Sequence, residues 1–466
     1  MRALLGTRSR GGRGATALCA SVVLLLATAA SAAADTWSQL APTGTPPAPR
    51  YDVGWNAYDV ANDRLVIFSG DTGGLPRPQD VWILTDATGV GGTPSWVQLA
   101  PSGAPPFGRF GGSVVYAPGS NRIIVHGGCA GNCGFALADT WVLTNANGLG
   151  GTPQWMPLPA VLPVNRAEHG AAYDPVSNRM IVFGGHQAFP GTNLNDVWVL
   201  TNADETGGIP TWVPLFPIGP PPTARQDFGT AYDVPNNRLI VFGGLENVAS
   251  TTFSDVWILT NANGLGGTPQ WIQLTPIGGP PLGRAAPVFQ YDPVANRVIL
   301  FGGSKVQGSP PIFLDEVWVL SGANGLAGTP QWTQLTPSGT PPAGRCCAAS
   351  GYSTASNRLV LALGRNDEVA PFLFNDAWVL AFNEPPDCSG VTASPGTLWP
   401  PNHRLRLVTL SGATDPDGDP VTLTITGVAQ DEPVSGLGGG DLSPDAQAGT
   451  QSNNVKVPRP SASRMT

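Results

Sequence analysis

The sequence predicts an all-β protein built from six copies of one unit. Each copy runs from an arginine through a turn, an apolar run, a glycine pair and an Asp-Val-Trp segment to a last tryptophan. The third copy shows the pattern in Arg166, Tyr173-Asp174, Asn178-Arg179, Gly184-Gly185, Asp196-Val197-Trp198 and Trp212. Beyond residue 34 no stretch keeps an apolar period of about 3.6 residues, so we expect almost no helix. A long repeat of this kind defines the architecture before any single residue is considered.

Each unit offers four short strand candidates. The first follows the arginine, as in 111–116, and the second ends in the glycine pair, as in 239–244. The third is the Asp-Val-Trp segment, as in 255–260, and the fourth begins at the last tryptophan, as in 271–274. All are rich in β-branched or aromatic residues and are bounded by Gly, Pro, Asn or Asp, which is typical of strands. The 60 Gly and 48 Pro are therefore interpreted as turn residues rather than as a sign of disorder.

Six such sheets can bury their faces by stacking around an axis. The last tryptophans of the units recur every 57 to 61 residues, at Trp37, Trp96, Trp155, Trp212, Trp271 and Trp332. The apolar run, the glycine pair and the two spaced aromatic residues resemble the kelch motif over residues 37 to about 382, as in the central domain of galactose oxidase. The resemblance implies a six-bladed kelch β-propeller.

The ends of the repeat region predict how the ring closes. The sixth unit has its Asp-Ala-Trp strand at 376–380 but no following tryptophan strand. The missing strand is at the other end, where 37–40 precedes the first arginine. We therefore expect the N-terminal strand to complete the last blade, which also removes an open edge. The strand-three tryptophans are expected to pack between blades, and the Tyr-Asp…Asn-Arg segments to form turns.

Residues 1–34 have the composition of an export signal. Four arginines precede an apolar run at 15–30, and Ala32-Ala33-Ala34 fits a cleavage site. No adjacent arginine pair supports the twin-arginine route, so we expect Sec-type secretion to the exterior or the cell surface. Removal of these four arginines would leave 20 basic and 32 acidic residues. Such a charge disfavours nucleic acid and anionic membranes as partners, and a monomer is expected.

Five cysteines follow the expected signal. Cys129 and Cys133 are interpreted as a local disulfide, because a metal site would need two further ligands and none is near in the sequence. Cys346 and Cys347 are adjacent, which disfavours a bond between them. One of them is a candidate partner for Cys388, and one thiol would then remain.

One arginine of each unit is a candidate binding residue. In some kelch propellers, the resemblance implies, arginines at this position ring the mouth of the channel and bind acidic peptide. A planar guanidinium group suits that task because it binds carboxylates with two hydrogen bonds. The alternative is that each arginine pairs with a structural aspartate such as Asp80, Asp139 or Asp196. The six candidates are Arg50, Arg109, Arg166, Arg225, Arg284 and Arg345.

The loops between the glycine pair and the third strand are the second candidate site. They differ in length and content within an otherwise regular repeat, which marks a possible binding face. Nearly every loop carries a phenylalanine, suited either to cap the blade or to contact a sugar or peptide: Phe135, Phe189, Phe253, Phe313 and Phe372.

Catalysis is not expected. The related galactose oxidases use tyrosine and histidine copper ligands and a Cys–Tyr crosslink, and here His126, His169, His186 and His403 are not paired in the sequence. His126 replaces a phenylalanine before a glycine pair, and with His169 is interpreted as a packing variant. No nucleophile elbow, H-E-x-x-H or phosphate loop is present.

The composition changes after Phe382. Segments around 398–403 and 414–419 resemble immunoglobulin-like modules of exported bacterial proteins, and 405–410 and 420–427 are strand candidates. Asp415, Asp417 and Asp419 are either Ca²⁺ ligands or part of a charged turn. Two strands do not make a stable sandwich, so the module is expected to be incomplete.

The predicted organisation is a signal peptide at 1–34, a propeller at 35–383, a partial immunoglobulin-like β module at 384–450 and a disordered tail at 451–466. The predicted function is a non-enzymatic binding scaffold that recognises a protein or glycan through one face of the propeller. It needs no cofactor apart from the Ca²⁺ considered for the tail. The alternative is a secreted carbohydrate-active or copper-oxidase-like enzyme that uses the propeller loops.

Overall fold

The computed structural model describes most of the chain as two compact units. The described residues are 2–5, 23–31, 34–52, 57–134, 136–159, 164–187, 191–246, 250–305, 311–368, 370–384, 386–394, 405–415, 421–430, 447–448 and 454–458. One unit is Asp35–Phe382, and the other combines Met1–Ala34 with Asn383–Thr466. The described residues contain strands and turns but no helix, as expected. None of them therefore forms a helix with the length and apolar character needed to span a membrane.

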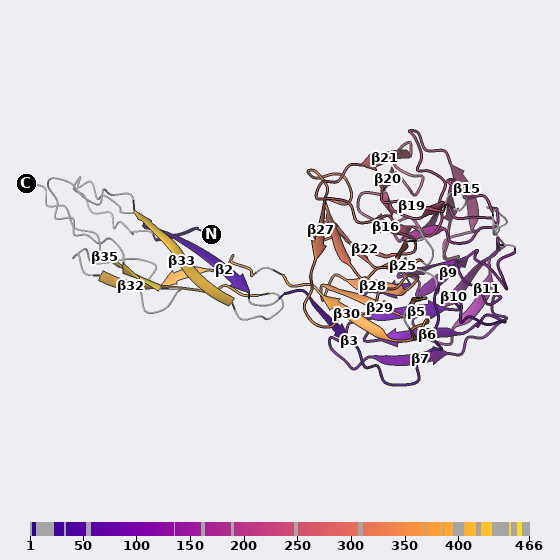
Figure 1. Ribbon diagram of the computed structural model, residues 1–466, viewed down its shortest axis with the longest axis horizontal. Coiled ribbons are helices and arrows are strands. Elements are labelled where there is room, and N and C mark those ends of the chain that lie inside the picture. Colours follow the sequence, from indigo (N-terminus) through magenta and orange to yellow (C-terminus); the bar gives the residue numbers. More distant parts are fainter. Residues whose placement is uncertain are drawn as a thin grey trace, which may run out of the picture. The chain divides into compact units, whose positions relative to one another are not determined.

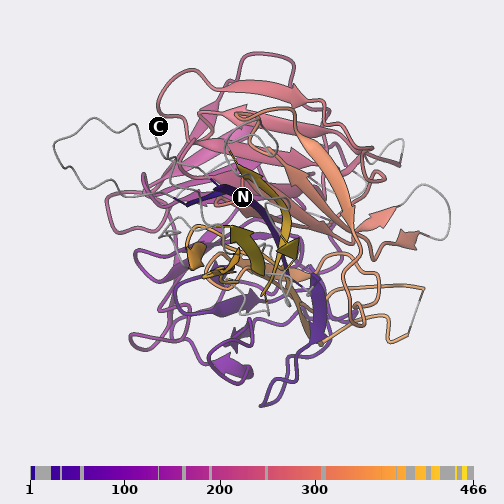
Figure 2. The same ribbon diagram turned by 90° about the vertical axis from the view of Figure 1, so that its left-hand side faces the viewer.

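The larger unit is a six-bladed propeller, which confirms the predicted fold class. Its sheets follow one another around the ring in chain order, from indigo through magenta to orange (Figures 1 and 2). Blade 1 is β4 (Tyr58–Asp59), β5 (Arg64–Phe68), β6 (Val81–Thr85) and β7 (Ser95–Leu99). Blade 2 is β8 (Ser113–Ala117), β9 (Arg122–His126), β10 (Thr140–Thr144) and β11 (Gln154–Pro157). Blade 3 is β12 (Gly170–Asp174), β13 (Arg179–Phe183), β14 (Val197–Thr201) and β15 (Thr211–Leu215).

The remaining blades repeat the same antiparallel order. Blade 4 is β16 (Gly229–Asp233), β17 (Arg238–Phe242), β20 (Val256–Thr260) and β21 (Gln270–Leu274), and blade 5 is β22 (Val288–Asp292), β23 (Arg297–Phe301), β26 (Val317–Ser321) and β27 (Gln331–Leu335). Two small hairpins extend their loops: β18 (Leu245–Glu246) with β19 (Thr251–Thr252), and β24 (Ser304–Lys305) with β25 (Ile312–Phe313).

The N-terminal strand closes the ring, as predicted. Blade 6 has β28 (Ala349–Ser353), β29 (Arg358–Ala362) and β30 (Ala377–Ala381), and its outer strand is β3 (Thr36–Gln39), which pairs antiparallel with β30. The Trp37 amide also donates to the Ser338 carbonyl at 2.9 Å, which ties β3 to the segment after blade 5. The two ends of the propeller are therefore held together without a covalent bond.

Tryptophans pack across each blade boundary. The strand-four tryptophan of one blade lies against the residue that precedes the glycine pair of the blade before it. Trp271 lies 4.8 Å from Phe183 between ring centroids, and Trp332 lies 5.2 Å from Phe242. His126 takes the place of the phenylalanine and lies 4.7 Å from Trp212. The strand-three Trp257 packs against blade 3 as well. Burial of these large rings is the main source of cohesion between blades.

The Tyr-Asp…Asn-Arg segments form the expected turns. In each blade the tyrosine hydroxyl donates to the side chain of the Asn or Asp five residues later, as from Tyr232 to Asn237 at 2.9 Å. That residue has positive φ, 51° for Asn237, which Asn and Asp tolerate well. The near-repeated loop between strands three and four is also structural, because Asn263 in blade 4 donates to Asp174 in blade 3 at 2.7 Å.

The described residues of the smaller unit form two sheets. One contains β1 (Arg2–Leu5), β2 (Val23–Ser31) and β33 (Val421–Gln430) in that order, and the other contains β31 (Thr392–Ser394), β32 (Leu405–Ser411), β35 (Asn454–Pro458) and β34 (Gln447–Ala448). The strand β35 lies in the segment 451–466 that we expected to be disordered, and it pairs with β32. The sequence signal for this strand was short, because Val455 and Val457 alternate with polar residues only up to Pro458.

Candidate functional site

The six predicted arginines are structural. Each is 0–2% exposed, and each guanidinium group binds the carboxylate that precedes the strand-three tryptophan of the same blade, with N–O distances of 2.5–3.0 Å. The partners of Arg50, Arg109, Arg166, Arg225, Arg284 and Arg345 are Asp80, Asp139, Asp196, Asp255, Glu316 and Asp376. Each tryptophan indole N–H donates to the same carboxylate at 2.6–3.0 Å.

This network corrects the prediction of an arginine ring for acidic ligands. The first Nη of each arginine also donates to the carbonyl of the first residue of the glycine pair or its counterpart, as from Arg109 to Gly127 at 2.8 Å. The guanidinium groups are thus directed into their own blades. Burial raises the pKa of the carboxyls, but the arginine hydrogen bonds more than offset it and lower the pKa of Asp139, Asp196 and Asp255 below the usual range.

A ring of residues lies two positions after these arginines. From Gly111 round to Asp52, neighbouring members are linked by backbone hydrogen bonds, including those from Asp227 to the Glu168 carbonyl at 3.0 Å and from Asp52 to the Cys347 carbonyl at 3.1 Å. The second of these bonds joins blade 1 to blade 6. We call this set the axial ring, and its members are Asp52, Gly111, Glu168, Asp227, Ala286 and Cys347.

All six members of the axial ring have left-handed backbone conformations, with φ of 46–61°. For residues other than glycine this conformation costs about 1–3 kcal/mol each, and such costs are concentrated at functional sites. Gly111 makes room for its neighbour, because a Cβ atom there would lie 3.0 Å from Glu168 Cγ. The backbone conformation of the axial ring is therefore the same in every blade, and only the side chains differ.

Three carboxylates gather on the axial ring. Asp52 is 5% exposed, and its Oδ1 has no hydrogen-bond partner among the described residues. Burial and then the charge of Glu168 raise the pKa of Asp52 to about 7. Burial, Glu168 and Asp52 raise the pKa of Asp227 well above its usual range. The centre of this face is therefore acidic and incompletely compensated.

A second set of residues surrounds the axial ring. The first residue after each glycine pair or its counterpart pairs through its backbone with the residue just before the axial ring, as His186 does with Ala167. We call this set the outer ring, and its members are Asp71, Cys129, His186, Leu245, Ser304 and Arg365. These residues begin the variable loops, so the loops surround the channel mouth on this face.

Side chains of the outer ring, and of the residues just before the axial ring, contact the carboxylates unevenly. Gln226 donates to Glu168, and His186 Nε2 lies 3.4 Å from Glu168 Oε2. Near Asp52, Tyr51 donates to Asp71 at 2.9 Å and accepts from Arg365 at 3.2 Å. Blade 5 contributes only Ala286 and Ser304 to the two rings. Blades 1, 3, 4 and 6 therefore place charged side chains at the mouth, while blade 5 presents small side chains.

The channel continues below the axial ring. A cavity of about 190 Å³ is lined by the innermost strands of blades 2 to 5, including Tyr116, Tyr173, Tyr232 and Tyr291. Two smaller cavities lie nearer the mouth, one beside Glu168 and His169 and one beside Ala286 and Cys347. The acidic mouth therefore leads into a channel with aromatic walls.

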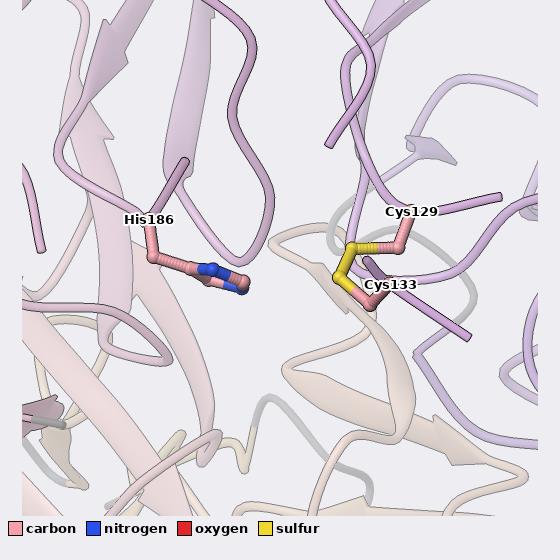
Figure 3. A group of neighbouring side chains, drawn as sticks. All are labelled: Cys129, Cys133 and His186. Atoms are coloured by element: carbon pink, nitrogen blue, oxygen red, sulfur yellow. A yellow bond between two sulfur atoms is a disulfide. The ribbon is translucent and has the colours of Figure 1, made fainter. Parts of the chain in front are cut away.

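Four of the five cysteines beyond residue 34 lie in the propeller, and Cys388 lies in the smaller unit. Cys129 and Cys133 are joined by a disulfide within the loop of blade 2, as Figure 3 shows. Cys346, Cys347 and Cys388 are free, and the Sγ atoms of Cys346 and Cys347 lie 2.7 Å apart. The pairing considered for Cys388 is therefore not present in this structure.

Histidines that are distant in the sequence come together. The rings of His126 and His169 are 5.4 Å apart, and each ring binds a hydroxyl, of Thr140 and Ser113 respectively. Burial lowers the pKa of His126 to about 3 and that of His169 well below its usual range. Both rings are therefore neutral packing elements under ordinary conditions.

The structure describes only some of the other predicted site residues. Phe253 stacks under Arg225 at 4.2 Å, whereas Phe372 is 55% exposed. Phe135 and Phe189 lie outside the described residues. Asp417 and Asp419 also lie outside them, so of the Ca²⁺ ligands considered for the tail the structure describes only Asp415.

Sequence reasoning missed the axial ring. Its members have no common residue type, so a search for conserved motifs between the repeats passes over them. The available signal was the register itself: the position two residues after each arginine holds Asp, Gly, Glu, Asp, Ala and Cys in turn. A position with constant geometry and variable chemistry is where a repeat protein differs between its units without losing its fold.

These features define the class as an all-β, six-bladed propeller with an N-terminal closing strand. The family model described as the KLHDC2/KLHL20/DRC7 Kelch-repeats domain matches residues 151–286 and 209–386, which together span just over half of the chain. The chain belongs to the kelch-repeat family. Among solved structures it is similar to one titled "Structure of YjhT", with a TM-score of 0.52 and 15% identity over 80% of this chain and 100% of that chain. At this identity the likeness supports the fold alone.

Proposed function

We propose that the protein is an exported, non-enzymatic scaffold that binds a protein or glycan on the face where the variable loops surround the axial ring. We further propose that the ligand places a positively charged group at the ring. One observation carries this proposal: Asp52 is buried beside Glu168 and Asp227, and its Oδ1 has no hydrogen-bond partner among the described residues. A buried carboxylate is costly unless it is paired.

The sign of the charge distinguishes this proposal from the arginine hypothesis. An arginine ring would select acidic peptides, whereas the axial ring favours lysine, arginine or an amino sugar. The other axial-ring members, including Cys347 and Ala286, add no charge to the ring. The overall excess of acidic residues, with a formal net charge of −8, agrees with a cationic ligand.

An array of lysine- and arginine-containing peptides and of chitosan oligosaccharides would test the proposal, with calorimetry on the strongest binder. We expect binding that weakens as salt rises and that falls at least about 10-fold in the double variant Asp52→Asn/Asp227→Asn. The matched control is Asp315→Asn/Glu368→Gln, which removes two exposed carboxylates from loops of the same face. Equal loss in both double variants would contradict a site at the axial ring, and turnover of the bound probe would favour the enzyme alternative.

A further inference from the structure

Two cysteines and a histidine from neighbouring blades converge beside the channel mouth. The Sγ atoms of Cys129 and Cys133 and a ring nitrogen of His186 all lie within 4.8 Å of one another, with the imidazole directed toward the sulfur atoms (Figure 3). The three residues are 0%, 6% and 0% exposed. No further ligand lies near Cys129 and Cys133 in the sequence, because His186 is 53 residues beyond Cys133 and in the next blade.

A carboxylate completes the group of potential ligands. Glu168 Oε2 lies 3.4 Å from His186 Nε2, and Glu168 is itself held by Gln226. Two sulfur atoms, an imidazole and an adjacent carboxylate are donors that zinc prefers, and three intervening residues between the cysteines fall within the usual spacing of zinc-binding pairs. A carboxylate next to a ligating histidine orients the ring and increases its basicity.

The propeller holds these groups in place through its backbone. Cys129 and His186 occupy the same position after the glycine pairs of blades 2 and 3, and both are fixed by reciprocal hydrogen bonds. Cys129 pairs with Phe110 at 2.8 and 3.1 Å, and His186 pairs with Ala167 at 2.9 Å in both directions. The Ala136 amide donates to the Gln187 carbonyl at 3.3 Å and joins the two loops. The scaffold therefore aligns the ligands without help from a metal.

We propose that this cluster is a redox-linked zinc site, formed when the disulfide between Cys129 and Cys133 is reduced. Two thiol groups of a small-molecule or protein reductant supply two electrons and two protons, giving two cysteine thiols and the disulfide of the reductant. Zn²⁺ then binds both sulfur atoms and His186, and the two thiol protons are released. In the reverse direction a disulfide oxidant accepts two electrons from the thiolates, the Cys129–Cys133 bond forms and Zn²⁺ leaves.

The two forms connect the propeller differently. The disulfide closes a loop within blade 2 alone, whereas zinc joins blade 2 to blade 3 through His186. Because export is expected, the disulfide form belongs to the oxidising exterior. The zinc form arises where a reductant reaches the folded propeller, and it then stabilises the boundary between these two blades.

Cobalt binding to the full chain would test the site, because thiolate coordination of Co²⁺ produces a charge-transfer absorption. We expect the protein reduced with a phosphine to bind one Co²⁺ with this absorption, and one Zn²⁺ to displace it. The air-oxidised protein should bind none at this site. This comparison needs no substitution, so misfolding of a variant cannot produce the result.

Variants assign the ligands in the same assay. Cys133→Ser and His186→Asn should each weaken Co²⁺ binding by more than about 100-fold, and Glu168→Gln by about 10–100-fold, as for residues that support a ligand. Cys388→Ser and Cys346→Ser are matched controls that keep the proposed ligands, and both should bind normally. Loss of the absorption in Cys346→Ser, or equal binding by the oxidised and reduced proteins, would overturn the proposal.

Discussion

Arg225 and Asp255 form a bidentate ion pair that is completed by the rest of the blade. The two Nη–Oδ distances are 2.6 and 2.9 Å, Nε donates to the Thr223 carbonyl at 2.9 Å, and Nη1 donates to the Gly243 carbonyl at 2.8 Å. Trp257 donates its indole N–H to the same carboxylate. One arginine thus connects the innermost strand, the glycine pair and the third strand, which explains its presence in every blade.

Removal of this arginine should destabilise the propeller. We expect Arg225→Ala to lower the free energy of unfolding by about 3–5 kcal/mol, because it leaves a largely buried carboxylate without its partner. The control is Asp367→Asn, which breaks the Arg365–Asp367 pair; that pair is more than one-third exposed on both sides, so its loss should cost at most about 1 kcal/mol. Urea denaturation followed by tryptophan fluorescence measures both. Similar losses for the two variants would contradict the structural role.

The contrast between these arginines and the axial ring shows what sequence can predict. Glycine pairs, tryptophans and turn residues recur because each blade solves the same packing problem, so their repetition predicted the fold and its closure by Trp37. Asp52 and His186 depend on which blades lie next to each other around the mouth. Repetition gives no information about them, since their interactions join positions 18 to 313 residues apart that only the closed ring brings together.

The closing strand should determine how the ring opens. Trp37 is 3% exposed and lies 5.1 Å from Phe301 between ring centroids. We expect Trp37→Ala to cost about 3–5 kcal/mol and to increase hydrogen exchange along β30, because the outer neighbour of β30 is then loosely held. Trp271→Ala is the matched control, since Trp271 occupies the same position in a blade made of consecutive strands. It should cost a similar amount and leave exchange in β30 unchanged.

His126 should make the protein sensitive to mild acid. Its pKa is about 3 in the folded protein because it is buried, and about 6.5 when unfolded. The unfolded state therefore binds the proton more tightly, so stability is lost as pH falls from about 6.5 toward 3. We expect His126→Phe, which restores the residue found before other glycine pairs, to be about 2 kcal/mol more stable at pH 5, relative to wild type, than at pH 7.5. Chemical denaturation at the two pH values measures this difference.

Asp52 should have the opposite pH dependence. Its pKa is about 7 when folded and near 3.8 when unfolded, so the folded state binds the proton more tightly. Its contribution to stability is complete below about pH 4 and is lost as pH rises through 7. For one carboxyl the loss is at most about 1.4 kcal/mol per pH unit, and Glu168 and Asp227 share it.

We expect Asp52→Asn to gain stability relative to wild type between pH 5 and 8. Denaturation at several pH values, with Asp315→Asn as the control, measures this gain. A gain of the same size in Asp315→Asn would assign the effect to total charge rather than to the axial ring. A cationic ligand should reduce the difference between wild type and Asp52→Asn at pH 8, because it compensates the charge that destabilises the free protein.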